Sequence, residues 1–149
     1  MGKLPLWGAL LTISGIAVAA FGWLGHERSR DRGDAVQLAL GAKLYAERCA
    51  SCHGAKLEGQ PNWQEPLASG RMPAPPHDAS GHTWHHSDEE LFTLTKKGVA
   101  ALVPGYESDM PAFEGSLSDD EIRAILAFIK STWAITEREY QRARSKPGA

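Results

Sequence analysis

The longest uninterrupted apolar stretch lies at the start of the chain, where residues 4–25 contain no charged side chain. A helix of this length would rise ~33 Å at ~1.5 Å per residue, enough to cross a hydrocarbon core of ~30 Å. Trp7 and Trp23 lie near its two ends, and aromatic rings favour the membrane interface. The pattern predicts a transmembrane anchor over residues 1–25, followed by a short charged linker over residues 26–33.

A secretory signal peptide is the competing interpretation of this stretch. Lys3 supplies a minimal positive start, and residues 17–19 would form a small-residue cleavage site. The apolar run is nevertheless longer than the ~7–15 residues of a typical signal peptide, which favours a retained anchor. The three arginines that follow the span argue by themselves for the opposite orientation in the membrane: Arg28, Arg30 and Arg32.

Beyond the linker, apolar positions recur at helical spacing. In the segment from Asp34 to Arg48, Val36, Leu40 and Leu44 fall on one face, with Tyr45 beside them. Gly41 lies in the middle of this segment, where glycine weakens a helix by ~1 kcal/mol relative to alanine. We therefore expect another backbone or a ring to approach the helix closely at Gly41.

Two further helices are predicted from their start signals. Ser87 with Glu90, and Ser118 with Glu121, each form an S-x-x-E capping box, and Gly98 is placed to end the first of these helices. The last helix has an apolar stripe at helical spacing: Ile122, Ile125, Leu126, Ile129 and Trp133.

The rest of the pattern predicts an all-α domain over residues 34–135. Residues 54–86 hold most of the prolines and show little periodicity, as is typical of a long functional loop. No stretch alternates convincingly with period two. Residues 136–149 are rich in charge and are predicted to form a charged C-terminal tail.

Charge excludes one class of partner. Residues 34–135 contain 8 Lys+Arg against 14 Asp+Glu, and the whole chain has a formal net charge of −2. The basic residues of the domain are neither clustered nor interleaved with aromatic residues, so no nucleic-acid binding is expected.

The chemistry of the chain centres on residues 49–53, which read C-A-S-C-H. The C-x-x-C-H arrangement is typical of covalent c-type haem attachment, in which two thiols bond the haem vinyl groups and the adjacent imidazole reaches the iron. Both cysteines of the chain, Cys49 and Cys52, belong to this motif, and His53 would be an axial ligand.

The two cysteines have three other interpretations. A thioredoxin-like redox pair belongs on a βαβ scaffold, and no such strand pattern is present. A structural zinc site needs two more ligands, which the later histidines could supply in principle. A local disulfide is the third. The histidine directly after the second cysteine favours haem over all three.

Residues 34–134 resemble a class I cytochrome c. Gly41 and Tyr45 match the small and aromatic positions of that family's first helix, and Phe128 matches the aromatic position of its last helix. The resemblance implies one covalent haem c. It also implies that Pro66 offers its carbonyl to Nδ1 of His53.

The resemblance further implies a methionine as the second axial ligand. Met110, in the sequence SDMPAF, matches the family's methionine loop, whereas Met72 lies in the proline-rich loop and is assigned to core filling. Trp84 is the predicted hydrogen-bond donor to a haem propionate, because a buried indole N–H seeks an acceptor.

The sequence offers more than one role for the histidine-rich run over residues 77–86. It contains His77, His82, His85 and His86. Bis-histidine haem ligation and a second metal site are two possible roles. The favoured interpretation is that these are polar loop residues, one or two of which bond a propionate.

Two protein axial ligands would leave the iron no open position, so the domain is expected to transfer single electrons rather than to act as an enzyme. By the resemblance, its partners would be membrane redox complexes: a quinol-oxidising complex and a terminal oxidase or reaction centre. The expected location is the bacterial cytoplasmic membrane, with the haem domain on the periplasmic side. The alternatives are a fixed haem subunit of a larger complex, and a sensor or enzyme with a displaceable methionine.

Overall fold

The computed structural model describes residues 32–146. The predicted anchor over residues 1–25 and most of the predicted linker lie outside this range. Within it, no helix is both long enough and apolar enough to cross a membrane. The chain divides into two compact units, Met1–Val36 and Gln37–Ala149, and the second contains all the residues of the predicted site.

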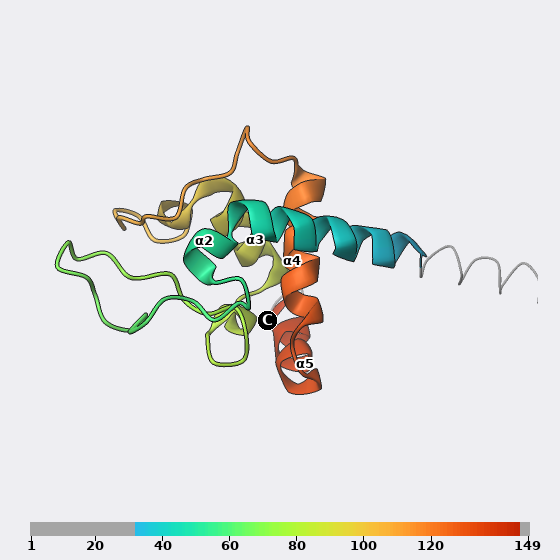
Figure 1. The fold of residues 1–149 in the computed structure, drawn as a ribbon. Coiled ribbons are helices and arrows are strands. Elements are labelled where there is room, and N and C mark those ends of the chain that lie inside the picture. The colour runs from blue at the N-terminus through green and yellow to red at the C-terminus, as the bar shows by residue number, and fades with distance from the viewer. Residues whose placement is uncertain (1–31, 147–149) are drawn as a thin grey trace, which may run out of the picture. The chain divides into compact units, whose positions relative to one another are not determined.

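The described residues form helices that are joined by loops and turns (Figure 1). One helix covers residues 32–48. It is followed by six shorter helices: α2 (Ala50–His53), η1 (Thr83–His85), α3 (Asp88–Lys97), η2 (Val99–Ala101), α4 (Asp119–Ser131) and α5 (Ile135–Arg144). The only β interaction in this part of the chain is an isolated bridge between Glu114 and Leu117. The all-α prediction is thus confirmed for the described residues.

Both predicted capping boxes are present. The Ser87 hydroxyl accepts from the Glu90 amide at 3.2 Å, and the Glu90 carboxylate accepts from the Ser87 amide at 2.7 Å. Ser118 and Glu121 repeat the exchange at the start of α4. Each box satisfies two amide groups that the first helical turn leaves without partners. α3 ends at Gly98, whose φ of 83° is costly for other residues.

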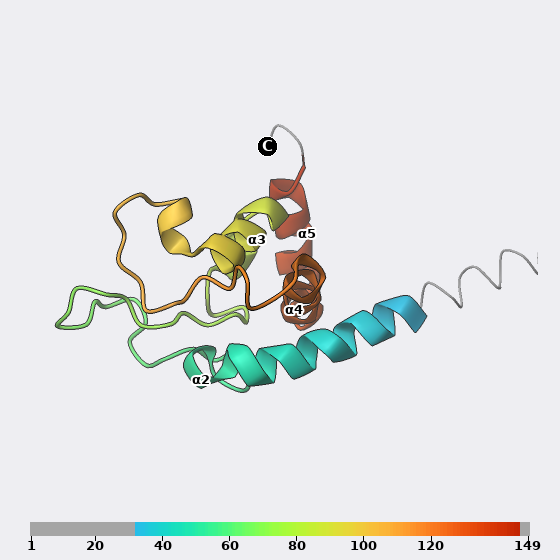
Figure 2. The same cartoon turned by 90° about the horizontal axis from the view of Figure 1, so that it is seen from above.

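Gly41 marks the place where residues 37–48 cross α4 (Figure 2). A Cβ at this position would overlap the backbone carbonyl of Ala124 and touch Phe128. One turn later, the Tyr45 ring packs against Phe128 with their centroids 5.5 Å apart. The close approach expected at Gly41 is confirmed, and the crossing lets α4 reach the backbone of the first helix.

The core lies between this crossing and α3. Its buried side chains come from the first helix, the loops, α3, α4 and the residues just after α4: Leu44, Tyr45, Leu57, Leu91, Phe113, Leu117, Ile122, Ile125, Ile129 and Trp133. The first helix contributes less than its pattern predicted, because Leu40 is 41% exposed and Val36 is 69% exposed. Its buried positions begin at Gly41, where α4 crosses it.

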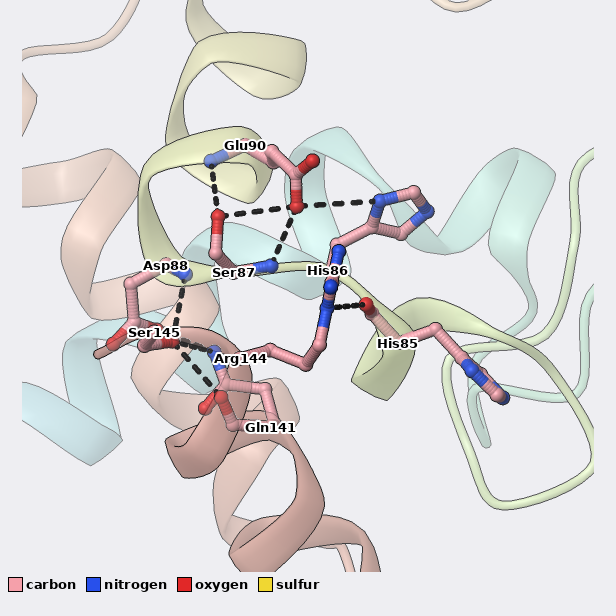
Figure 3. A network of polar contacts seen from close by, with 8 residues as sticks. All are labelled: His85, His86, Ser87, Asp88, Glu90, Gln141, Arg144 and Ser145. Carbon is pink, nitrogen blue, oxygen red and sulfur yellow. Dashed lines mark hydrogen bonds and ion pairs between the residues drawn. The ribbon is translucent and has the colours of Figure 1, made fainter. Parts of the chain in front are cut away.

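Most of the predicted charged tail forms a helix, α5, which the apolar pattern did not indicate. α5 packs against η1 and the start of α3 (Figure 3). Gln141 is only 2% exposed, and its amide donates to the Asp88 carboxylate at 2.8 Å. The Asp88 amide donates to the Ser145 hydroxyl at 3.0 Å, and Arg144 donates to the His85 carbonyl. Polar contacts hold α5 here, so an apolar pattern could not reveal it.

Candidate functional site

The cysteine motif forms one tight helical turn. Cys49 lies at the end of the first helix, and α2 continues directly from it. The His53 amide donates to the Cys49 carbonyl at 2.9 Å, and the Gly54 amide donates to the Ala50 carbonyl at 3.0 Å. The turn therefore brings Cys49, Cys52 and His53 together through local backbone bonds.

The two thiols do not form a disulfide, and they do not resemble a redox pair. Cys49 and Cys52 are both free. Burial, assisted by the neighbouring Cys52, raises the pKa of the Cys49 thiol to about 11. A redox dithiol needs a cysteine with a lowered pKa, because the thiolate is the nucleophile. Cys49 lacks that property, which argues against the thioredoxin-like interpretation.

His53 is held in the tautomer that an iron ligand needs. Its side chain is 7% exposed, and Nδ1 lies 2.8 Å from the carbonyl oxygen of Pro75. A carbonyl only accepts, so Nδ1 must carry the proton and Nε2 keeps its lone pair. Burial lowers the pKa of His53, and the bond to Pro75 offsets part of that effect. The ring is therefore neutral and can bind a metal through Nε2.

The carbonyl partner is Pro75, so the prediction of Pro66 is wrong. Pro66 is exposed. The loop folds so that Gln60 donates to the Ala74 carbonyl at 2.9 Å, and His77 donates to the Leu57 carbonyl at 2.8 Å. These bonds bring Pro75 beside the motif. Both prolines lie in the same aperiodic loop, and its pairing could not be read from sequence spacing.

Tyr45 is hydrogen-bonded to the residue that follows the cysteine motif. Its hydroxyl donates to the Gly54 carbonyl at 2.8 Å, so one hydrogen bond spans the whole C-x-x-C-H turn. Burial is the main cause that raises the pKa of Tyr45, followed by the charges of Cys49 and Glu58. The sequence placed Tyr45 only beside the apolar face of the first helix, at the family's aromatic position, and missed this bond.

His77 lies directly against His53. The two rings are stacked, with centroids 4.0 Å apart and planes 20° apart. Two axial imidazoles would meet an iron end-on from opposite faces, so rings stacked side by side cannot both ligate one iron. Burial lowers the pKa of His77 to about 3, with smaller effects from His53 and His82. Bis-histidine ligation by this pair is therefore excluded.

The other histidines form no metal site. His82 stacks on Trp63 with centroids 5.4 Å apart, and His86 lies 3.8 Å from the Glu90 carboxylate. His85 packs against Trp84. Across residues 32–146, no group of three or more His, Cys, Asp or Glu side chains is arranged to hold a metal ion. The second metal site considered from the sequence has no support here.

Met110 packs against the core cluster, half-buried, and its amide donates to the Ser108 hydroxyl at 3.1 Å. Met72 is half-buried in the proline-rich loop. The two loops are tied together next to these methionines, because Arg71 donates to the Asp109 carboxylate at 2.6 Å. The role of Met110 as a ligand stays a prediction.

Trp84 has the unpaired donor that the sequence suggested. Its Nε1 is buried and finds no hydrogen-bond partner among residues 32–146, while its ring packs edge-on to Tyr140. A buried indole N–H without an acceptor is costly, which fits a site completed by an acceptor from outside the protein. With the free thiols and the free Nε2 of His53, these residues fit haem c. Bonding of Trp84 to a propionate stays a prediction.

Comparisons with known proteins agree with this geometry. The cytochrome c family matches residues 38–133. Cytochrome c6 of Leptolyngbya boryana is 30% identical over 91 residues, which cover 61% of this chain and 87% of that protein. No solved structure matches the chain significantly.

A second relative is larger. The Cbb3-type cytochrome c oxidase subunit FixP of Bradyrhizobium sp. (strain ORS 278) is 29% identical over 93 residues, which cover 62% of this chain but only 27% of that subunit. The family and both relatives support haem-based electron transfer. The chain belongs to the cytochrome c family, and its cofactor is covalently bound haem c.

Proposed function

We propose that the chain is a single-electron carrier in which Cys49 and Cys52 bind one haem and His53 and Met110 are the axial ligands. The observation that carries this proposal is the bond from His53 Nδ1 to the Pro75 carbonyl, which leaves Nε2 free toward a metal. When bound, the haem supplies a one-electron iron couple whose potential depends on the axial ligands.

The protein residues favour transfer over chemistry at the iron. His53 is buried and neutral, and Met110 would occupy the opposite position with a thioether, a ligand that raises the reduction potential. With both positions filled, small molecules have no site to bind. The proposal therefore excludes an enzyme or a sensor that binds small molecules at the iron, because either function would require Met110 to dissociate.

We further propose that residues 1–25 anchor the chain in the bacterial cytoplasmic membrane with the haem domain on the periplasmic side. The support is the uncharged run from Leu4 to Gly25. The partners would be membrane redox complexes, a quinol-oxidising complex and a terminal oxidase or reaction centre. A tether of this kind raises the effective concentration of partners in the same membrane.

A fixed subunit of an oxidase complex is the second candidate. It is favoured by the similarity to FixP, which is named as a subunit of a cbb3-type oxidase. A carrier would be extracted from native membranes alone, whereas a fixed subunit would be extracted together with other subunits in constant ratio. Mild detergent extraction followed by size-exclusion chromatography separates the two outcomes.

The cofactor and its ligands can be tested on the purified holoprotein. Intact-mass measurement should give the chain plus one haem, and haem staining should survive denaturing electrophoresis. The reduced protein should not bind carbon monoxide, and the oxidised protein should show a methionine-to-iron charge-transfer band. Carbon monoxide binding by the unaltered protein would contradict the proposed carrier.

A further inference from the structure

The ring of His53 has two protein contacts that act in different ways. The Pro75 carbonyl holds one atom of the ring, Nδ1, at 2.8 Å. His77 instead covers a face of the ring, with the centroids 4.0 Å apart and the planes 20° apart. The hydrogen bond at Nδ1 restrains rotation of the ring about its Cβ–Cγ bond, but hydrogen bonds tolerate a range of angles, so some rotation is left. A flat neighbour on one face limits this remaining rotation, because the turned ring would collide with it.

His77 can act in this way only if its own ring is fixed, and the structure shows that it is. Its Nδ1 lies 2.8 Å from the Thr83 hydroxyl oxygen, and that hydroxyl reaches the Pro76 carbonyl at 3.4 Å. These contacts are satisfied together when Thr83 donates to Pro76 and His77 donates to Thr83. Thr83 is itself only 5% exposed.

The backbone of His77 is held on both sides. Its amide donates to the Leu57 carbonyl at 2.8 Å, and its carbonyl accepts from the Trp133 indole at 2.7 Å. The Tyr45 ring stands edge-on to His77, with centroids 6.3 Å apart. Contacts from the loop, from the residue after α4 and from the first helix therefore converge on His77.

We propose that His77 is a positioning residue, whose ring, fixed by Thr83, sets the rotation of the His53 imidazole. This rests on the proposed ligation of iron by His53. Partners that orient a ligating histidine tune the metal site without touching the metal. Rotation of an imidazole ligand would change the overlap of its π orbitals with the iron d orbitals, and so the energy gaps between those orbitals. These gaps set the electron paramagnetic resonance (EPR) g values of the oxidised protein, which therefore report the rotation.

The test compares four variants of the full-length holoprotein. His77→Ala removes the flat neighbour, His77→Phe restores a flat ring without the Thr83 bond, and Thr83→Val keeps the shape of residue 83 but removes its hydroxyl. His85→Ala is the matched control, because His85 lies in the nearby helix η1, is exposed and packs on Trp84 and Tyr140, away from His53. The readouts are the g values of the oxidised protein and its reduction potential.

We expect His77→Ala to change the g values and the potential, and Thr83→Val to change both in the same direction by less. His77→Phe should return the g values toward those of the unaltered protein, and His85→Ala should leave them unchanged. If His77→Ala fails to fold, Thr83→Val decides the outcome.

Two results would overturn the proposal. One is unchanged g values in both His77→Ala and Thr83→Val. The other is a His77→Phe protein that behaves like His77→Ala, since stacking would then not be the cause. The proposed function fails in a separate way: the unaltered oxidised protein would lack the low-spin spectrum of histidine–methionine ligation.

Discussion

At the scale of single residues, two methionines are candidates for the second axial ligand of the iron. Only one of them, Met110, packs against the core cluster. Met110 contacts the core cluster from a loop that Asp109 ties to Arg71. Met72 lies one residue after that same arginine. Each methionine therefore follows a residue of the ion pair that joins the two loops, although 38 residues separate Arg71 from Asp109.

Replacing Met110 with alanine is expected to open the sixth coordination position. The reduced variant should bind carbon monoxide, and its reduction potential should fall by a fraction of the ~0.8 V range over which axial ligands act. Optical spectra with and without carbon monoxide, together with a redox titration, measure both effects. Met72→Ala is the control and should keep the original spectrum. The reverse pattern would assign the ligand to Met72.

At the scale of elements, the closest packing occurs where residues 37–48 cross α4. Gly41→Ala should lower the free energy of unfolding, because overpacking against the Ala124 carbonyl costs about 1–3 kcal/mol and exceeds the ~1 kcal/mol gained in helix propensity. Urea unfolding of the holoprotein measures the change. Gly33→Ala is the control, since a Cβ there would have no other described residue within 4 Å apart from its chain neighbours and the backbone of its own helix. Equal effects at both positions would refute a steric origin.

Asp88 joins three helices and predicts a pH dependence. Burial raises its pKa, but hydrogen bonds from Lys130 and Gln141 outweigh burial, so the pKa lies below its ordinary value of 3.8. A carboxylate with a lowered pKa stabilises the fold above its unfolded-state pKa, and this contribution disappears as the pH falls through the folded-state pKa. The contribution should be small, on the order of 1 kcal/mol or less, because the side chain is 58% exposed.

Asp88→Asn should therefore be less stable than the unaltered protein at pH 7 and equally stable well below pH 3.8. Thermal unfolding at a series of pH values gives the difference directly. Asp120→Asn removes a carboxylate that is 97% exposed and pairs with Arg123 of the same helix, so it should show little change. A stability difference for Asp88→Asn that grows in acid would contradict the assignment.

The elements that could be predicted from the sequence are those whose residue pattern is local. The two capping boxes each lie within four residues, and the stripe of α4 repeats every three or four residues, so both could be read from the sequence. The role of Pro75 could not be read from the sequence, because Pro75 reaches His53 only through the pairing of Gln60 with Ala74 in the loop. α5 was missed for a related reason: the residue it buries most deeply is Gln141, a polar side chain whose partner Asp88 is 53 residues away.

At the scale of the whole molecule, the described residues include the predicted haem site, and the proposed membrane anchor over residues 1–25 lies outside them. If residues 1–25 are retained, intact-mass or peptide mapping of the mature protein should find them, and the protein should require detergent rather than salt for extraction. A mature chain that begins near Ala20 or Phe21 and is recovered from the soluble fraction would instead indicate a cleaved signal peptide and a freely diffusing carrier.

The separation of contacts along the chain has a consequence for the order of folding. The bonds around the cysteine motif close short loops: Tyr45 to Gly54 spans 9 residues, and His53 to Pro75 spans 22. The bonds between the segment 77–88 and the segment 133–145 span 53 to 59 residues. Closing a longer loop costs more entropy, so distant contacts form later. The cysteine turn is therefore expected to form before the C-terminal segment docks, so that its two thiols are arranged for haem attachment at an early stage of folding.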